Sequence, residues 1–217
     1  MMRKARRRRG GEEHSAVTRI VEVLKKELIN GTLSADTLIV ETQIGKRFGV
    51  SKTPAREALA RLSGMGFVKV IPGKGYTVTK LSWQQIKDLF EVRLLLESAA
   101  IEMAAARATS EDITSLEEAA LLPRRSPLSI EELLDANLQF HCLIWRTTRN
   151  ERLFQLASQV MDDLIRAMHT AMMSEDTEGM VEQHLHMTAL IAQKKSNEAR
   201  EAMVEHVDAT RRRLLGL

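Results

Sequence analysis

The stretch that decides the fold reads Gly49-Val50-Ser51-Lys52-Thr53-Pro54-Ala55-Arg56-Glu57-Ala58-Leu59-Ala60-Arg61-Leu62, in a chain of 217 residues. Before it, Val40, Ile44 and Phe48 recur at helical spacing, and Gly49 interrupts that pattern. A second helix is expected after Gly49, with Ser51 as a hydroxyl N-cap and Pro54 in the first turn, where a missing N–H costs little. The stretch therefore predicts a helix-turn-helix.

The second helix of this motif has one apolar and one polar face. Ala55, Leu59 and Leu62 share the apolar face, while Lys52 and Arg56 lie on the other. A first turn with hydroxyl groups and long cations suits a major groove, where it can hold phosphates and reach guanine edges. The alternative is an ordinary surface helix with solvated cations.

A β-hairpin is expected directly after the motif. The runs 67–71 and 76–79 favour strands, and Pro72-Gly73-Lys74-Gly75 joins them. The hairpin would place Lys74 at its tip, with Gly73 and Gly75 allowing a close approach of the backbone to the sugar-phosphate edge. This hairpin is the expected wing of a winged helix-turn-helix.

The segment before the motif contains one more helix and a basic arm. Val17, Ile20, Leu24 and Leu28 form a helical stripe, which predicts the first helix of a DNA-binding domain at 15–80. Residues 1–14, with six cations between Arg3 and Arg9, are expected to be a disordered basic arm or a solvated tail. Without these cations the formal net charge of +3 becomes −3, so DNA binding would depend on local patches.

Composition places the chain in a reducing compartment. No apolar segment reaches the length of a membrane span, and the N-terminus lacks the apolar stretch of a secretory signal. The single cysteine, Cys142, excludes an intrachain disulfide framework. We expect a cytoplasmic protein, associated with the nucleoid when bound to DNA, without membrane partners.

The remaining residues, 81–217, predict an all-helical antiparallel bundle of about six helices. Ser82 and Ser129 begin capping boxes, and further helix starts are expected at the following positions. They are Ser110, Asn150, Ser174 or Thr177, and Asn197. The fold class is therefore mainly α, with a winged helix-turn-helix followed by a helical bundle.

Polar groups lie in the middle of four apolar faces of this bundle when its helices are drawn at about 100° per residue. They are Arg93 and Glu97 on one helix, Asn137 and His141 on the next, and His184 and His206 on the last two. Burying such groups unpaired costs a few kcal/mol, so they are expected to satisfy one another, a metal ion or a ligand. Three histidines with an oxygen ligand suit Zn, Ni, Fe or Mn.

The N-terminal part resembles the winged helix-turn-helix of the GntR family of bacterial transcription regulators. The resemblance rests on Phe48, Gly49-Val50-Ser51, Thr53-Pro54, Arg56-Glu57-Ala58-Leu59 and the wing. It implies that Ser51, Lys52, Thr53 and Arg56 contact DNA, with Gly73 at the wing tip. Lys52 and Thr42 stand where many or some members carry arginine, and lysine lacks the bidentate fork that discriminates bases.

The C-terminal part resembles the FCD effector domain of the FadR branch of that family. The shared features are Glu91-Val92-Arg93, Glu97, Phe140-His141, Asn150, His184 and His206. The resemblance implies a divalent metal ion bound by Asn137, His141, His184 and His206, and a small carboxylate metabolite as effector. Arg93, beside Glu97, would grip that carboxylate, and the alternative is an intrahelical Arg93–Glu97 pair.

These observations predict a homodimeric regulator of transcription, a repressor rather than an activator and not an enzyme. A two-fold dimer would match a palindromic operator in double-stranded DNA. Two alternatives remain open at this point. One is a DNA-binding protein with a purely structural bundle and no effector, and the other is a metalloenzyme that uses the histidine cluster.

Overall fold

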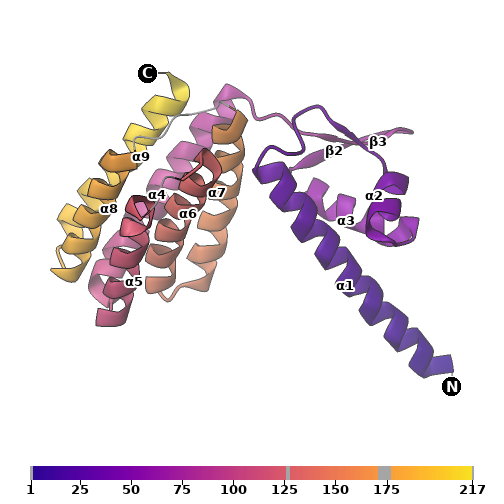
Figure 1. Ribbon diagram of the computed structural model, residues 1–217, viewed down its shortest axis with the longest axis horizontal. Helices are drawn as coiled ribbons and strands as arrows, with labels where there is room; N and C mark the ends of the chain where they lie inside the picture. The colour runs from indigo at the N-terminus through magenta and orange to yellow at the C-terminus, as the bar shows by residue number, and fades with distance from the viewer. Residues whose placement is uncertain (1, 126–127, 171–176, 217) are drawn as a thin grey trace. The chain divides into compact units, whose positions relative to one another are not determined.

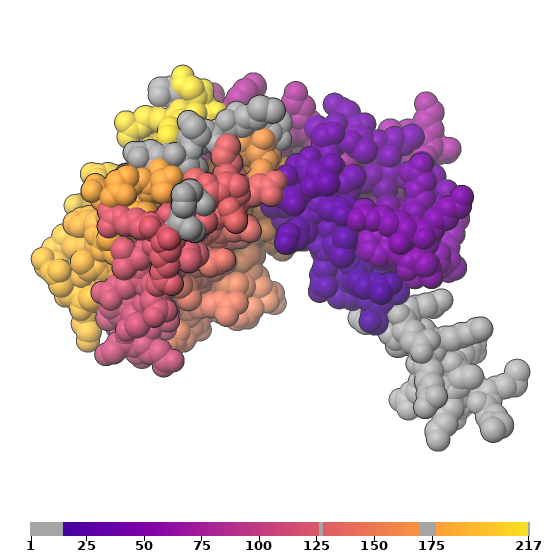
Figure 2. Space-filling view, in the orientation of Figure 1, coloured from indigo at the N-terminus to yellow at the C-terminus, as the bar shows by residue number. Residues whose placement is uncertain are grey.

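The structure is a computed structural model that describes residues 2–125, 128–170 and 177–216, and only the backbone of residues 2–14 and 170. It forms two compact units that divide between Leu81 and Ser82 (Figures 1 and 2). The first unit combines three helices with a small sheet, and the second is helical. No helix among the described residues is long and apolar enough to cross a bilayer.

The first unit begins with α1 (Met2–Ile29), whose predicted apolar stripe is confirmed. Val17, Ile20, Leu24 and Leu28 are all buried and form a core with the helices α2 (Glu41–Phe48) and α3 (Lys52–Gly64). Because the side chains of residues 2–14 lie outside the described part, the expected basic arm at 1–14 stays a prediction.

The turn between α2 and α3 has the expected position but not the expected cap. Gly49 ends α2 in the left-handed region, with φ of 66°, and its N–H returns to carbonyls of α2. Ser51 stands at the N-cap of α3 in extended conformation, but its hydroxyl makes no capping hydrogen bond. The predicted hydroxyl cap is therefore wrong, and the Ser51 side chain stays on the exposed surface.

The sheet has three antiparallel strands in the order β1-β3-β2. The predicted hairpin is confirmed as β2 (Val68–Ile71) and β3 (Gly75–Val78), with Val70 opposite Tyr76. β1 (Leu38–Ile39) pairs with the other side of β3 and was missed, because two residues are too few to show alternation. The strand β1 lies directly before α2, so the sheet connects the wing to the helix-turn-helix.

The second unit contains the expected six α-helices within its described residues, and Figure 1 shows them alongside one another. They are α4 (Trp83–Arg107), α5 (Ser110–Leu121), α6 (Ile130–Thr147), α7 (Glu151–Thr170), α8 (Thr177–Ala192) and α9 (Ser196–Leu215). A short 3₁₀ helix, η1 (Leu122–Arg124), stands where the sequence predicted a loop. The candidate helix start at Ser174 lies outside the described residues.

The helix starts agree with the capping chemistry of the sequence. Ser82 and Ser129 form complete capping boxes with Gln85 and Glu132, as predicted. The Asn150 side chain accepts from the N–H of Leu153, 3.1 Å away, and so caps α7. These caps fix where each helix begins and hence which residues face the interior.

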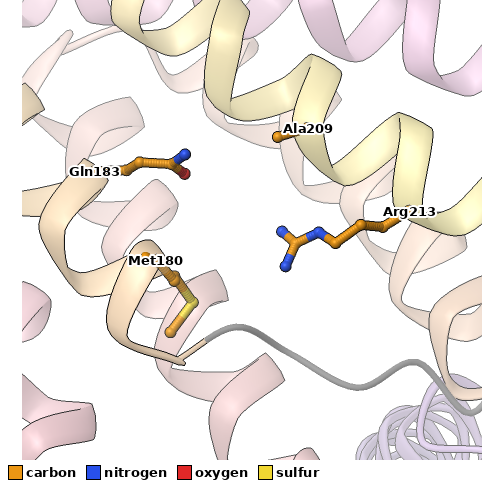
Figure 3. Close-up of a pocket in the computed structure, with 5 residues that line it drawn as sticks. Met180, Gln183, Ala209 and Arg213 are labelled. Atoms are coloured by element: carbon orange, nitrogen blue, oxygen red, sulfur yellow. The ribbon is translucent and has the colours of Figure 1, made fainter.

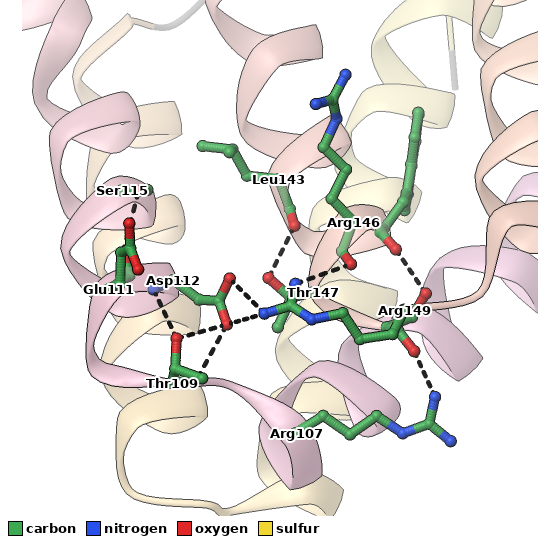
Figure 4. Close-up of polar contacts among 11 residues, drawn as sticks. Arg107, Thr109, Glu111, Asp112, Ser115, Leu143, Arg146, Thr147 and Arg149 are labelled. Carbon is green, nitrogen blue, oxygen red and sulfur yellow. Dashed lines mark hydrogen bonds and ion pairs between the residues drawn. The ribbon is translucent and has the colours of Figure 1, made fainter.

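A polar network closes the end of the bundle where α4 meets α5 and α6 meets α7 (Figure 4). Asp112 accepts from the Thr109 backbone N–H at 2.9 Å and from the Arg149 guanidinium at 2.7 Å. Arg107 of α4 donates to the carbonyl oxygen of Thr148. These bonds join the loops between the helices, so the register of the helices is held at this end.

Candidate nucleic-acid interface and histidine cluster

The predicted DNA-contacting residues lie mainly on the surface of the first unit. Thr42 of α2, Ser51 before α3, and Lys52, Thr53 and Arg56 of α3 are all exposed. The opposite face of α3 is buried, with Ala55, Ala58, Leu59 and Leu62 fully covered. Burial of this face fixes the rotation of the helix about its axis, and the polar side chains are presented outward as one set.

An acidic residue stands among these cations. The Glu41 carboxylate at the start of α2 lies 3.0 Å from the ammonium nitrogen of Lys52 at the start of α3. The sequence gave no hint of this pair, because the two residues are separated by the turn. The described residues place no such partner beside Arg56, so Lys52 and Arg56 differ in their surroundings.

The tip of the wing exposes Gly73 and Lys74, whereas Gly75 faces the neighbouring strand. Gly75 has φ of 125°, and a Cβ atom there would lie 2.6 Å from the carbonyl oxygen of Ile39 in β1. This separation is shorter than any side chain tolerates. The close backbone approach that needs this glycine is thus made within the sheet.

In the second unit, three histidines from three helices converge. The side chains of His141 of α6, His184 of α8 and His206 of α9 are at most 2% exposed, and each offers a nitrogen within 4.8 Å of the others. The Nε2 atoms of His141 and His206 are 3.2 Å apart. The prediction that these residues face a common interior is confirmed by their burial.

Neighbouring groups fix the orientation of the three rings. Gln183 Oε1 lies 2.8 Å from His206 Nδ1, which favours a proton on Nδ1 and a lone pair on Nε2. Glu97 Oε1 lies 2.9 Å from His141 Nδ1 and favours the same tautomer there. The ring of His184 stacks on Phe140 with centroids 3.9 Å apart, and its buried Nε2 has no hydrogen-bond partner in the described residues.

Arg93 and Glu97 are also buried and complete the cluster. Arg93 Nε lies 3.4 Å from Glu97 Oε1, and Arg93 Nη2 lies 3.2 Å from His141 Nε2. The indole N–H of Trp145 donates to Glu97 Oε2 at 2.9 Å. The intrahelical pair that the sequence left as an alternative is therefore present.

The electrostatics follow from this arrangement. Burial alone would raise the pKa of Glu97, but His141, Arg93 and Trp145 together outweigh it and lower the pKa to about 2. Burial lowers the pKa values of His184 and His206 well below the usual 6.5, and the neighbouring positive charges lower them further. Glu97 is thus ionised, while His184 and His206 are neutral near pH 7.

Two further residues of α6 lie near the cluster in sequence. Asn137 is half-buried one turn before His141, and its role as the fourth metal ligand stays a prediction. Cys142 is half-buried, and burial raises the pKa of its thiol to about 11. The thiol is therefore protonated and does not belong to the donor set.

A pocket of about 190 Å³ opens between α8 and α9 (Figure 3). It is lined by Gly179, Met180, Gln183, Ala209 and Arg213, and the side chains of Gln183 and Arg213 point into it from opposite sides. The sequence analysis missed both. Their positions on the polar faces of α8 and α9 look like ordinary solvated positions, so no pattern in the sequence could have found them.

A winged helix-turn-helix joined to a helical domain with an internal polar cluster defines a class of DNA-binding transcription regulators. The pattern of the bacterial regulatory proteins of the gntR family matches residues 16–78, and that of the FCD domain matches residues 88–209. The chain belongs to the GntR family, with the FadR-like architecture that ends in an FCD domain. It is a DNA-binding transcription regulator and not an enzyme.

Two relatives cover most of their own length. The chain is 31% identical to the Nta operon transcriptional regulator of Aminobacter aminovorans over 170 residues, which is 78% of this chain and 80% of the relative. It is 30% identical to the Uxu operon regulator of Haemophilus influenzae over 220 residues, covering 92% of this chain and 82% of the relative.

Solved structures show the same fold. McbR/YncC of E. coli matches with a TM-score of 0.77 at 20% identity, over 92% of this chain and 96% of that one. A structure described as a metal-free FCD domain matches with a TM-score of 0.53 at 19% identity, over 63% of this chain and 96% of that one.

Proposed function

We propose that this regulator is a cytoplasmic, homodimeric repressor whose affinity for a palindromic operator is controlled by a small carboxylate metabolite and a divalent metal ion in the bundle. The observation that carries this proposal is the convergence of His141, His184 and His206 in the interior of the second unit. A purely structural bundle would gain more from apolar side chains at these positions, because burying polar groups costs free energy.

The donor set supports a metal ion. With protons on both Nδ1 atoms, the Nε2 lone pairs of His141 and His206 would face each other across 3.2 Å, and a shared cation would relieve that repulsion. Two ligands of a tetrahedral site with bonds of about 2.1 Å would lie about 3.4 Å apart. The unpartnered Nε2 of His184 offers a third donor, and Asn137 is the proposed fourth.

Such an ion would act as a Lewis acid that attracts a carboxylate oxygen. His141 Nε2 has a single lone pair, so it cannot both accept from Arg93 and bind a metal ion. Arg93 would then need another acceptor, and a carboxylate fits its two parallel donors. The proposed role of Arg93, with Glu97 as its alternative partner, therefore belongs to the metal-loaded protein.

The metal is tested by mass spectrometry of the purified protein, together with its melting temperature before and after chelation. We expect near-stoichiometric Zn, Ni, Mn or Fe and a melt that chelation lowers. His184→Ala should abolish both, whereas His186→Ala, an exposed histidine on the same helix, should leave both unchanged. Metal-free protein that does not respond to added Zn, Ni or Mn would contradict the proposal.

For DNA, we propose that the exposed set on the first unit makes the contacts. Ser51, Thr53 and Thr42 would hold phosphates, Lys52 and Arg56 would reach base edges in the major groove, and the wing tip would follow the backbone. The wing contributes Gly73 and Lys74, with Gly75 shaping the tip. The exposure of these residues around one helix face supports the assignment.

Dimerisation is proposed because one recognition helix reads too few base pairs. The bundle exposes Val92 and Leu95 of α4 and Leu156 of α7, which are 44, 73 and 53% exposed. A second copy would cover these apolar side chains. Sedimentation at micromolar concentration should give a dimer for the wild type and a monomer for Leu95→Glu, and a monomeric wild type would contradict the proposal.

Regulation would work by linkage, since an effector shifts operator affinity only if it binds one placement of the recognition helices more tightly. Operator affinity should change by about 5- to 150-fold in the presence of an effective carboxylate, measured by fluorescence anisotropy with metal present. An affinity that no two- to four-carbon carboxylate changes would favour the structural bundle without an effector.

A further inference from the structure

We infer that the pocket between α8 and α9 is the binding site for the anionic end of a small ligand, held by Arg213 and coupled to the histidine cluster through Gln183. This inference rests on the proposed function only for its regulatory consequence. The binding itself is a property of the pocket. It places the effector contact on the last two helices, in addition to Arg93.

The chemistry of the pocket wall favours an anion. Arg213 is the charged residue among the five that line it, and its guanidinium points into the space from α9 (Figure 3). Gln183 points in from α8, while Met180 and Ala209 supply apolar wall on either side. A guanidinium facing an amide across an apolar wall suits a carboxylate with a short carbon chain.

The size of the pocket limits the ligand. Its volume of about 190 Å³ lies below the range of about 300–1,000 Å³ for pockets that hold drug-sized ligands. At about 30 Å³ per water molecule, it corresponds to roughly six waters. A carboxylate of two to four carbons fits this space, whereas a nucleotide or a long acyl chain does not.

Gln183 connects the pocket to the cluster in one step. Its Oε1 accepts from His206 Nδ1 at 2.8 Å, and this bond decides which nitrogen of His206 carries the lone pair. His206 Nε2 lies 3.2 Å from His141 Nε2. A ligand that contacts Gln183 therefore acts on the residue that orients His206 toward its neighbours.

By contrast, Arg93 borders no pocket in the described residues, and the surrounding groups use its donors. It lies against Glu97 and His141 at 2% exposure. Arg213 also donates to Thr210 Oγ1 at 3.4 Å, but its side chain reaches solvent and the open pocket. A ligand arriving from solvent would meet Arg213 before it could reach Arg93.

The test is calorimetric titration of the full chain, treated with chelator, with acetate, glycolate, malonate and succinate. Acetamide and malonamide serve as uncharged probes of similar shape. We expect at least one carboxylate to bind and the amides not to bind. Arg213→Gln should weaken binding at least tenfold, whereas Arg212→Gln, an exposed neighbour that does not line the pocket, should change it less than twofold.

A second variant separates the pocket from a merely charged surface. Ala209→Phe fills the space from its wall and leaves the charge of Arg213 in place, so carboxylate binding should again fall at least tenfold. Equal melting temperatures of the ligand-free variants and the wild type would show that folding is intact. Unchanged carboxylate binding in Ala209→Phe or in Arg213→Gln would overturn the inference.

The remaining outcomes separate this inference from the proposed function. If none of the four carboxylates binds while metal and operator still bind, the pocket assignment alone is wrong. If a carboxylate binds as expected and the protein takes up no metal, the metal proposal is wrong and the pocket stands. Equal binding of acetate and acetamide would overturn the anion preference.

Discussion

The first unit exposes an ion pair, and the second unit buries one. Lys52 and Glu41 lie at the surface of the helix-turn-helix, with side chains 65 and 16% exposed. Arg93 and Glu97 lie inside the bundle, with side chains 2 and 1% exposed. The first pair costs little to break, so DNA can take over the lysine, whereas the second cannot lose a partner without leaving a buried charge.

The largest effect is expected from removing one charge of the buried pair. Glu97→Ala leaves Arg93 without its carboxylate and Trp145 without its acceptor, so the free energy of unfolding should fall by about 3–5 kcal/mol. Urea denaturation measures this change. Glu102→Ala, an exposed carboxylate on the same helix, should lose no more than about 0.5 kcal/mol. Equal losses in the two variants would contradict the comparison.

Acid should also destabilise the second unit. His184 and His206 have pKa values lowered mainly by burial, so they stay neutral when folded but take up protons near pH 6.5 when unfolded. Their contribution is present above pH 6.5 and is lost as the pH falls below it. Glu97 adds a loss between about pH 4.5 and its folded pKa of about 2. Chelated protein denatured at pH 7.5 and 5.5 should show the difference, which His206→Gln should reduce.

On the exposed side, Arg56→Ala should abolish specific operator binding without unfolding the protein. A bidentate contact to a base is worth about 1–3 kcal/mol, and a dimer would lose it twice. Arg61→Ala removes a cation from the same helix that already pairs with Glu57, and it should have a smaller effect. An operator affinity that survives Arg56→Ala, measured at fixed salt, would refute the assignment of α3 as recognition helix.

The smallest effect on stability is expected from the exposed pair itself. Glu41→Gln should change the free energy of unfolding by less than about 1 kcal/mol, because the pair is screened by water. Its affinity for non-specific DNA should rise, since a carboxylate beside the phosphate contacts is removed and Lys52 is released. Glu22→Gln on α1 is the matched control, and an equal rise there would show a general charge effect.

The same contrast explains what the sequence could predict. Periodicity placed Arg93, Glu97, His141, His184 and His206 in the interior, because a polar residue in an apolar stripe is visible without any knowledge of its partner. The partners themselves were not visible. Contacts such as Trp145 to Glu97, Gln183 to His206 and Glu41 to Lys52 depend on how separate helices meet.

Local rules failed where tertiary structure decides. Ser51 has the residue type and position of an N-cap, yet its hydroxyl makes no capping bond. The strand β1 has only Leu38 and Ile39, and pairing with β3 defines it rather than any pattern of its own. The pocket between α8 and α9 exists only because Gln183 and Arg213 face each other across two helices.

The protonated thiol of Cys142 has a practical consequence for studying this regulator. With a pKa of about 11, it reacts slowly with maleimides near neutral pH, and it is the single cysteine of the chain. A cysteine introduced at the exposed Lys74 could thus be spin-labelled selectively. In a dimer, two such labels would report the distance between the wings directly, with and without carboxylate, and convert the linkage into a measured displacement.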